Sequence, residues 1–273
     1  MSVLPIQPAS KAIELPAMVE GLTGDEYRAH DGTTQSDLNR FAESPALWKL
    51  VKEPASKAMQ LGTILHSMAL EGVSAFYTKP AFYGPDSKPW NGNATECKVW
   101  IAEHSDLPIL SIDEAHSLRS ASEAVRNHET CASWLRDGHA EVSVFTKWGK
   151  GRIDYIAFRG DHINVVDLKT CQDARHRKFQ GTIMERGYHI QAAWYRRLIR
   201  EFTDLPIRYR FIALELAPIP RINCFTLTES AIDQGDERVD WLLERMAECR
   251  EKNRWPDFHS HDMGETGDID LPE

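Results

Sequence analysis

Two short segments place carboxylates where they could hold a metal ion. Asp154 lies in GRID, and Asp167 lies in VVDLKT with Lys169 two residues further on. Side chains alternate between the faces of a strand, so Asp167 and Lys169 would share one face while Leu168 points to the other. The backbone carbonyl of Leu168 would still be available as an oxygen ligand. Carboxylates, carbonyls and water are the ligands that Mg²⁺ prefers in proteins.

Phosphodiester hydrolysis is the chemistry that such a group could perform. A bound cation neutralises the phosphate and lowers the pKa of the attacking water, and a nearby lysine can stabilise the developing charge. The DxK spacing alone is weak evidence, because a solvated carboxylate on an exposed strand face is the commoner arrangement. Two charges at the end of an apolar strand are stronger evidence, since burying them without a metal or another partner would be costly.

Further positions could support this chemistry, although each has a simpler structural explanation. His66 lies in LGTILHSMALEG, which has the pattern of a helix, and spacing alone predicts a packed or partly exposed helix residue. Gln191 and Tyr195 stand four residues apart on one face of another helix, where Tyr195 could equally belong to the core. Glu141, on the strand before Asp154, is a looser candidate.

The apolar patterning predicts one α+β domain with an N-terminal helical lobe. In the first of its strands, Ala140, Val142 and Val144 should share one face. We expect strands at 139–148, 150–158, 162–168, 209–217 and 221–227, and helices at 34–50 (with a restart at Pro45), 56–70, 94–103, 112–127, 185–202 and 229–252. The domain would span residues 34–255, after an extended or flexible arm (1–33) and before an acidic, flexible tail (256–273).

Composition argues against several other kinds of protein. The longest apolar stretches are far below the roughly 20 residues that a membrane-spanning helix needs. The N-terminus lacks the pattern of a secretory signal, so we expect a cytoplasmic protein without a membrane partner. Five widely spaced cysteines without a CxxC pair indicate neither a disulfide framework nor a zinc ribbon, and they disfavour an iron-sulfur cluster.

The net charge of −9 is unfavourable for a protein that binds a polyanion. Its distribution is uneven, because residues 255–273 contain six acids and no Lys or Arg. Between Lys169 and Arg210, ten basic residues stand against four acidic ones. This basic zone adjoins the candidate site, and it could be a nucleic-acid surface or only a solvated helix face.

Five segments, taken together, resemble a known family. They are QSDLNRFAESPALWKL, LGTILHSMALEG, GRIDYI, VVDLKT and YHIQAAWY. In order and approximate spacing, from about Thr34 to Asp257, they are similar to the PD-(D/E)XK nucleases and closely to the RecE-type exonuclease domain (exodeoxyribonuclease VIII). The resemblance implies a central mixed sheet flanked by helices.

The resemblance also implies roles for individual residues. His66 would be a metal ligand together with Asp154, Asp167 and the Leu168 carbonyl. Lys169 would be the catalytic lysine. All of these residues would then meet around one or two cations.

The block that contains Gln191 and Tyr195 would contact substrate or support the site, whereas Glu141 matches an acidic position only loosely.

The implied activity is that of a Mg²⁺-dependent exonuclease, with Mn²⁺ as a possible substitute. It would degrade one strand of duplex DNA from an end, 5'-to-3', in phage-type recombination inside a bacterial or phage-infected cell. The implied partners are DNA ends, a single-strand annealing protein and further copies of the chain in a tetrameric ring. A structure-specific endonuclease of the same superfamily and a non-catalytic DNA-binding module remain the alternatives.

Overall fold

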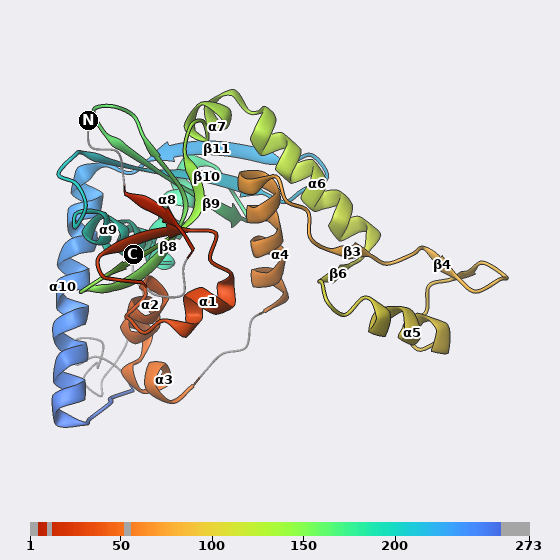
Figure 1. Ribbon diagram of the computed structural model, residues 1–273, viewed down its shortest axis with the longest axis horizontal. Helices are drawn as coiled ribbons and strands as arrows, with labels where there is room; N and C mark the ends of the chain where they lie inside the picture. The colour runs from red at the N-terminus through yellow and green to blue at the C-terminus, as the bar shows by residue number, and fades with distance from the viewer. Residues whose placement is uncertain (1–4, 10–12, 52–55, 258–273) are drawn as a thin grey trace, which may run out of the picture.

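One large mixed sheet with helices on both faces forms the centre of the protein (Figure 1). The computed structural model describes residues 5–9, 13–51 and 56–257. Across the sheet the strands are β1 (Ile6–Pro8), β2 (Ala17–Glu20), β7 (His139–Thr146), β8 (Gly149–Phe158), β9 (Ile163–Cys171), β10 (Ile207–Glu215) and β11 (Arg221–Thr226). The pairs β1/β2 and β9/β10 are parallel, and the other neighbours are antiparallel. This arrangement confirms the predicted α+β class.

The two faces of the sheet are covered by different helices. One apolar cluster joins the sheet to α2 (Gln35–Glu43), α8 (His176–Glu185), α9 (Tyr188–Ile199) and α10 (Glu229–Lys252). A second cluster joins the opposite face to α4 (Lys57–His66), the π-helical turn η1 (Ser67–Glu71), α6 (Ile112–Asn127) and α7 (Glu129–Trp134). Neighbouring residues of β9 divide between them, with Val165 in the first cluster and Val166 in the second, as alternation along a strand requires.

The segment between η1 and α6 extends away from the sheet (Figure 1). It holds two small pairs of strands, β3 (Tyr77–Thr78) with β6 (Ile109–Leu110) and β4 (Phe82–Tyr83) with β5 (Lys88–Pro89), and the helix α5 (Thr95–Glu103). Two short helices, α1 (Gly24–Ala29) and α3 (Pro45–Leu50), complete the described part of the chain. None of its helices is both long enough and apolar enough to cross a membrane.

Two predicted helices are divided differently from expectation, and a left-handed glycine lies at the end of the first and at the break in the second. The helix expected over 56–70 becomes π-helical after His66 and stops at Gly72, which has φ +75°. The helix expected over 185–202 is split into α8 and α9 by Gly187, at φ +64°. These left-handed conformations are easy for glycine and end a helix.

Two segments of the N-terminal stretch, β1 and β2, belong to the sheet, and a third forms α1. Residues 1–33 were expected to form an extended or flexible arm, but β2 pairs with β7, and Met18 within it is fully buried. Its extended conformation therefore comes with firm packing. Of the predicted acidic tail (256–273), residues 258–273 lie outside the described residues.

The packing of α10 on α9 depends on a glycine. A Cβ added to Gly235 would lie 2.3 Å from the carbonyl oxygen of His189. We expect Gly235→Ala to lower the free energy of unfolding by about 1–3 kcal/mol, because overpacking outweighs the gain of about 1 kcal/mol in helix propensity.

Gly181 in α8 provides the matched control, since no atom lies within 4 Å of its added Cβ. Gly181→Ala should leave stability unchanged or raise it by up to about 1 kcal/mol. Urea denaturation measures both variants. A Gly235→Ala variant as stable as the unmodified protein would contradict the close approach of α9 and α10.

Candidate functional site

Three acidic residues lie side by side across β7, β8 and β9. The β7/β8 register pairs the neighbours of Glu141 with the neighbours of Asp154, so these two acids face each other. The β8/β9 ladder ends where Tyr155 pairs with Val166, which makes Asp154 and Asp167 the next positions along it. Alternation along the strand predicted the face on which Asp167 lies. The alignment of all three acids follows only from the register of the paired strands.

The backbone of β7 is distorted at Glu141. This residue has φ +52°, a left-handed conformation that is unusual for a side chain other than glycine. The prediction that Ala140, Val142 and Val144 share a face is therefore wrong: Val142 and Val144 pack towards α9, while Ala140 packs in the cluster that contains α4. The change of face at Glu141 occurs where the acids meet.

His66 brings the end of α4 against this row of acids. Its Nδ1 lies 3.4 Å from Asp154 Oδ2 and 3.8 Å from Glu141 Oε1. Its Nε2 lies 2.8 Å from the carbonyl oxygen of Leu168. The Leu168 side chain is buried in the cluster that contains α4, on the face opposite to the Asp167 side chain, as the alternation of β9 predicts.

Asp167 and Lys169 form a buried ion pair beside these groups. Lys169 Nζ lies 2.8 Å from Asp167 Oδ1, and the Tyr209 hydroxyl donates to Asp167 Oδ2 at 2.9 Å. The ammonium group also lies over the ring of Tyr188, 4.8 Å from its centroid. Both the position and the charge of Lys169 are thereby fixed by neighbouring side chains.

The acids titrate differently because their partners differ. Burial raises the pKa of Asp154 to about 8, although His66 and Lys169 oppose that rise. Burial acts in the same direction on Asp167, but Lys169 together with hydrogen bonds from Asp154, Lys169 and Tyr209 holds its pKa below the usual value. Burial alone would lower the pKa of His66, yet Asp154 and Glu141 raise it to about 9. Asp154 and His66, which are in contact, therefore hold protons more tightly than the free side chains do when no cation is bound.

The donor atoms around Asp154 fit a divalent cation. Ligand atoms of His66, Glu141 and Asp154 all lie within 4.8 Å of one another, and the Leu168 carbonyl adjoins His66. Two carboxylates and a carbonyl suit Mg²⁺ or Mn²⁺, and imidazole suits the latter as well. Asp167 stands outside this close group, with its oxygens held by Lys169 and Tyr209. The cluster thus includes Glu141, for which the sequence had given only a loose match.

Gln191 and Tyr195 lie beneath the sheet and support it. Both are buried, and the Tyr195 hydroxyl donates to the carbonyl oxygen of Arg152 at 2.7 Å. Arg152 in turn donates from Nε to Glu141 Oε2 at 2.7 Å. These contacts favour a supporting position for Tyr195 over contact with a ligand.

Several neighbours of the site were not predicted from the sequence. A hollow of about 370 Å³ opens beside Glu141 and Asp154, and it is also lined by Tyr27, Arg28 and Glu71. The position of Arg152, two residues before Asp154, was a signal that could have been used. Tyr27 and Arg28 belong to α1, and nothing local in their sequence indicates that they reach the site.

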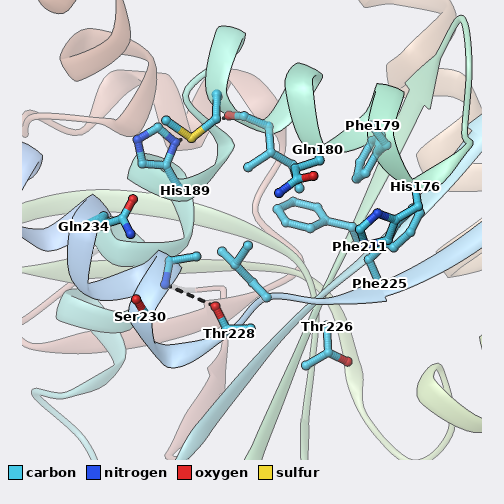
Figure 2. Close-up of a pocket in the computed structure, with 14 residues that line it drawn as sticks. His176, Phe179, Gln180, His189, Phe211, Phe225, Thr226, Thr228, Ser230 and Gln234 are labelled. Carbon is cyan, nitrogen blue, oxygen red and sulfur yellow. Dashed lines mark hydrogen bonds between the residues drawn. The ribbon is translucent and has the colours of Figure 1, made fainter.

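A second hollow, of about 350 Å³, lies between α8, β11 and the start of α10 (Figure 2). Aromatic rings form much of its wall, among them Phe179, Phe211 and Phe225. Its polar lining includes His176 and His189 but no carboxylate. It therefore lacks the donors of the acidic cluster.

The basic zone predicted between Lys169 and Arg210 is partly neutralised inside the fold. Arg196 of α9 pairs with three acids of α10, including Asp233 at 2.6 Å, and Arg197 pairs with Asp240 at 2.6 Å. These arginines of α9 join two helices. They therefore form neither a free nucleic-acid surface nor a simply solvated helix face.

The pKa shifts predict how stability depends on pH without a divalent cation. The folded-state pKa of His66 is about 9 against an ordinary value of 6.5, so its contribution is complete below 6.5 and is lost as the pH rises through 9. The pKa of Asp154 is about 8 against 3.8, which adds a loss of stability between those values. Thermal unfolding in EDTA should therefore show a falling midpoint from about pH 6 to about pH 9.

Mg²⁺ or Mn²⁺ should raise the midpoint most at the alkaline end, because the cation competes with protons for the same donors. Asp154→Asn should flatten the profile and remove most of the response to the cation. An equal cation response in Asp154→Asn and the unmodified protein would exclude Asp154 as a ligand.

Comparisons with known proteins agree with this geometry. Residues 34–262 match the model of a family described as "PDDEXK-like domain of unknown function (DUF3799)". No curated protein sequence matches the chain. The crystal structure of a "putative exonuclease" from Eubacterium rectale is similar in fold, with 14% identity, coverage of 92% of this chain and 96% of that chain, and a TM-score of 0.61. Because the family model covers most of its sequence, the chain belongs to the family of PDDEXK-like domains.

Proposed function

We propose that this protein is a metal-dependent deoxyribonuclease that acts as an exonuclease. One observation carries the proposal: His66 and Asp154 meet within 3.4 Å, beside a buried pair of Asp167 and Lys169. Buried carboxylates are costly, and a cation that approaches phosphate would offset that cost. Membership of the PDDEXK-like family and the fold of the bacterial neighbour support the same activity.

The cation and the protein side chains would play different parts in hydrolysis. A divalent cation held by His66, Glu141, Asp154 and the Leu168 carbonyl would neutralise the phosphate and supply a water of lowered pKa. The carboxylates of Asp167 and Asp154 raise the pKa of Lys169 against the effect of burial, so this lysine stays charged. It would therefore stabilise negative charge or orient the attacking water, and it would not act as a general base.

The finer assignment is an exonuclease that degrades one strand of duplex DNA from an end, 5'-to-3', with Mg²⁺ that Mn²⁺ can replace. Its support is the ordered set of five segments that resemble the RecE-type domain, together with the description of the structural neighbour as an exonuclease. Recognition of the phosphate backbone would make cleavage independent of sequence. Such an enzyme would serve phage-type recombination in the cytoplasm of a bacterial or phage-infected cell.

Duplex DNA labelled separately at its 5' and 3' ends tests this proposal. We expect Mg²⁺-dependent release of nucleotides, loss of release in EDTA, and earlier release of the 5' label. Asp167→Ala should reduce the rate by at least about 1,000-fold, because it removes the partner that fixes Lys169. The control is Asp161→Asn, which changes an exposed acid just before the same strand and should leave the rate within about twofold.

Circular dichroism must show that both variants are folded. A rate in Asp167→Ala close to that of the unmodified protein would refute the site. Cleavage of covalently closed circular DNA would favour the endonuclease alternative, since an exonuclease needs an end. Equal, negligible release with Mg²⁺ and with EDTA would favour a non-catalytic DNA-binding module.

We further propose that the working form is a tetrameric ring that encircles DNA and delivers its single-stranded product to an annealing protein. The support is the resemblance to the RecE-type domain. Sedimentation equilibrium should then give a mass of four times the 31.1 kDa of the chain. A monomer at all working concentrations would exclude the ring.

A further inference from the structure

A second group of metal-binding side chains lies where α6 and α7 meet the sheet edge. His128 links the two helices, Cys131 lies in α7, and Cys224 lies on β11, the edge strand of the sheet among the described residues. One donor atom from each residue lies within 4.8 Å of the other two. The chain separates the two cysteines by 93 residues, so the fold alone brings them together.

The spacing of the two sulfurs is close to that of two thiolates bound to one Zn²⁺. Cys131 Sγ lies 3.5 Å from Cys224 Sγ. Two sulfurs on one Zn²⁺ stand about 3.8 Å apart, given Zn–S bonds of about 2.3 Å. A disulfide needs about 2.05 Å and would leave the third donor without a role. The imidazole beside both sulfurs therefore favours a metal ion over a disulfide.

The imidazole of His128 is available for a metal ion. Its Nδ1 accepts a hydrogen bond from the Cys131 backbone N–H at 3.5 Å, so this nitrogen carries a lone pair. At that distance the hydrogen bond is weak, and redirecting the lone pair costs little.

The charges of the three side chains would balance that of a Zn²⁺ ion in the interior of the protein. Cys131 is fully buried and Cys224 is half-buried, within the apolar cluster that includes Leu118 and Leu214. Two thiolates offset the two charges of Zn²⁺, and the imidazole is neutral, so no net charge enters the core. Thiolate and imidazole donors select soft or borderline cations, in contrast to the oxygen-rich cluster of Glu141 and Asp154.

We propose that His128, Cys131 and Cys224 bind Zn²⁺ with two Zn–S bonds and one Zn–N bond, with water in the fourth position. Binding releases the two thiol protons to solvent and involves no oxidation or reduction. The ion fastens the α6–α7 corner to β11. Since β11 pairs with β10, and β10 with the strand that carries Asp167, the ion stabilises the edge of the sheet behind the acidic cluster.

Cobalt substitution tests this proposal on the full chain. After removal of metals by chelation under reducing conditions, one equivalent of Co²⁺ should give a near-ultraviolet thiolate-to-cobalt absorption band. Oxygen and imidazole ligands of the acidic cluster cannot produce that band. Zn²⁺ should abolish it by competition, and Zn²⁺ should raise the midpoint of thermal unfolding by a few degrees.

Three variants assign the band to this group. Cys224→Ser should weaken Co²⁺ binding at least about tenfold and remove most of the band. Cys249→Ser, which changes a half-buried thiol on α10, should keep the band, and so should Asp154→Asn. The proposal is overturned if the reduced protein gives no band, or if the band survives in Cys224→Ser. A Cys131–Cys224 disulfide that forms in air while the reduced protein takes up no Zn²⁺ overturns it as well.

Discussion

Three carboxylates occupy adjacent positions on β7, β8 and β9, and the rest of the site follows from the need to offset their charge. Each acid has its own cationic partner: Arg152 for Glu141, His66 for Asp154 and Lys169 for Asp167. Arg152 and Lys169 are supplied by the strands themselves, whereas His66 comes from α4. Breaking such a buried pair leaves an uncompensated charge, so the position of α4 on the sheet is tied to the site.

The same constraint explains why the sheet opens at this point. Asp154 Oδ2 accepts the backbone N–H of Leu168 at 3.0 Å, which replaces a hydrogen bond of the strand ladder. Glu141 takes a left-handed conformation in the next strand. The backbone is thus reorganised without leaving this N–H unpaired in the interior. That reorganisation turns the Leu168 carbonyl towards the imidazole and away from ordinary pairing between β8 and β9.

Local rules predicted the parts of the site that depend on one strand. Alternation was sufficient for Asp167, Leu168 and Lys169, because period two determines their faces. It failed at Glu141, whose positive φ reverses the alternation, and no residue type in HAEVSVFT signals that reversal. The partners of the α9 arginines were predictable in part, since α10 carries acids three and four residues apart. The approach of α1 to the site required contacts between distant segments, which a single sequence does not contain.

The pairing of α9 with α10 also bears on how an acidic protein could hold DNA. Acidic residues of α10 neutralise the charges of Arg196 and Arg197, so these arginines add little to the long-range attraction of phosphate. Near the acids, Arg152 and Lys169 are likewise engaged by carboxylates. A divalent cation would relieve this engagement, because carboxylates that bind the cation attract the two side chains less. Binding of the cation and of phosphate would then strengthen each other, and by linkage each would raise the affinity for the other by the same factor.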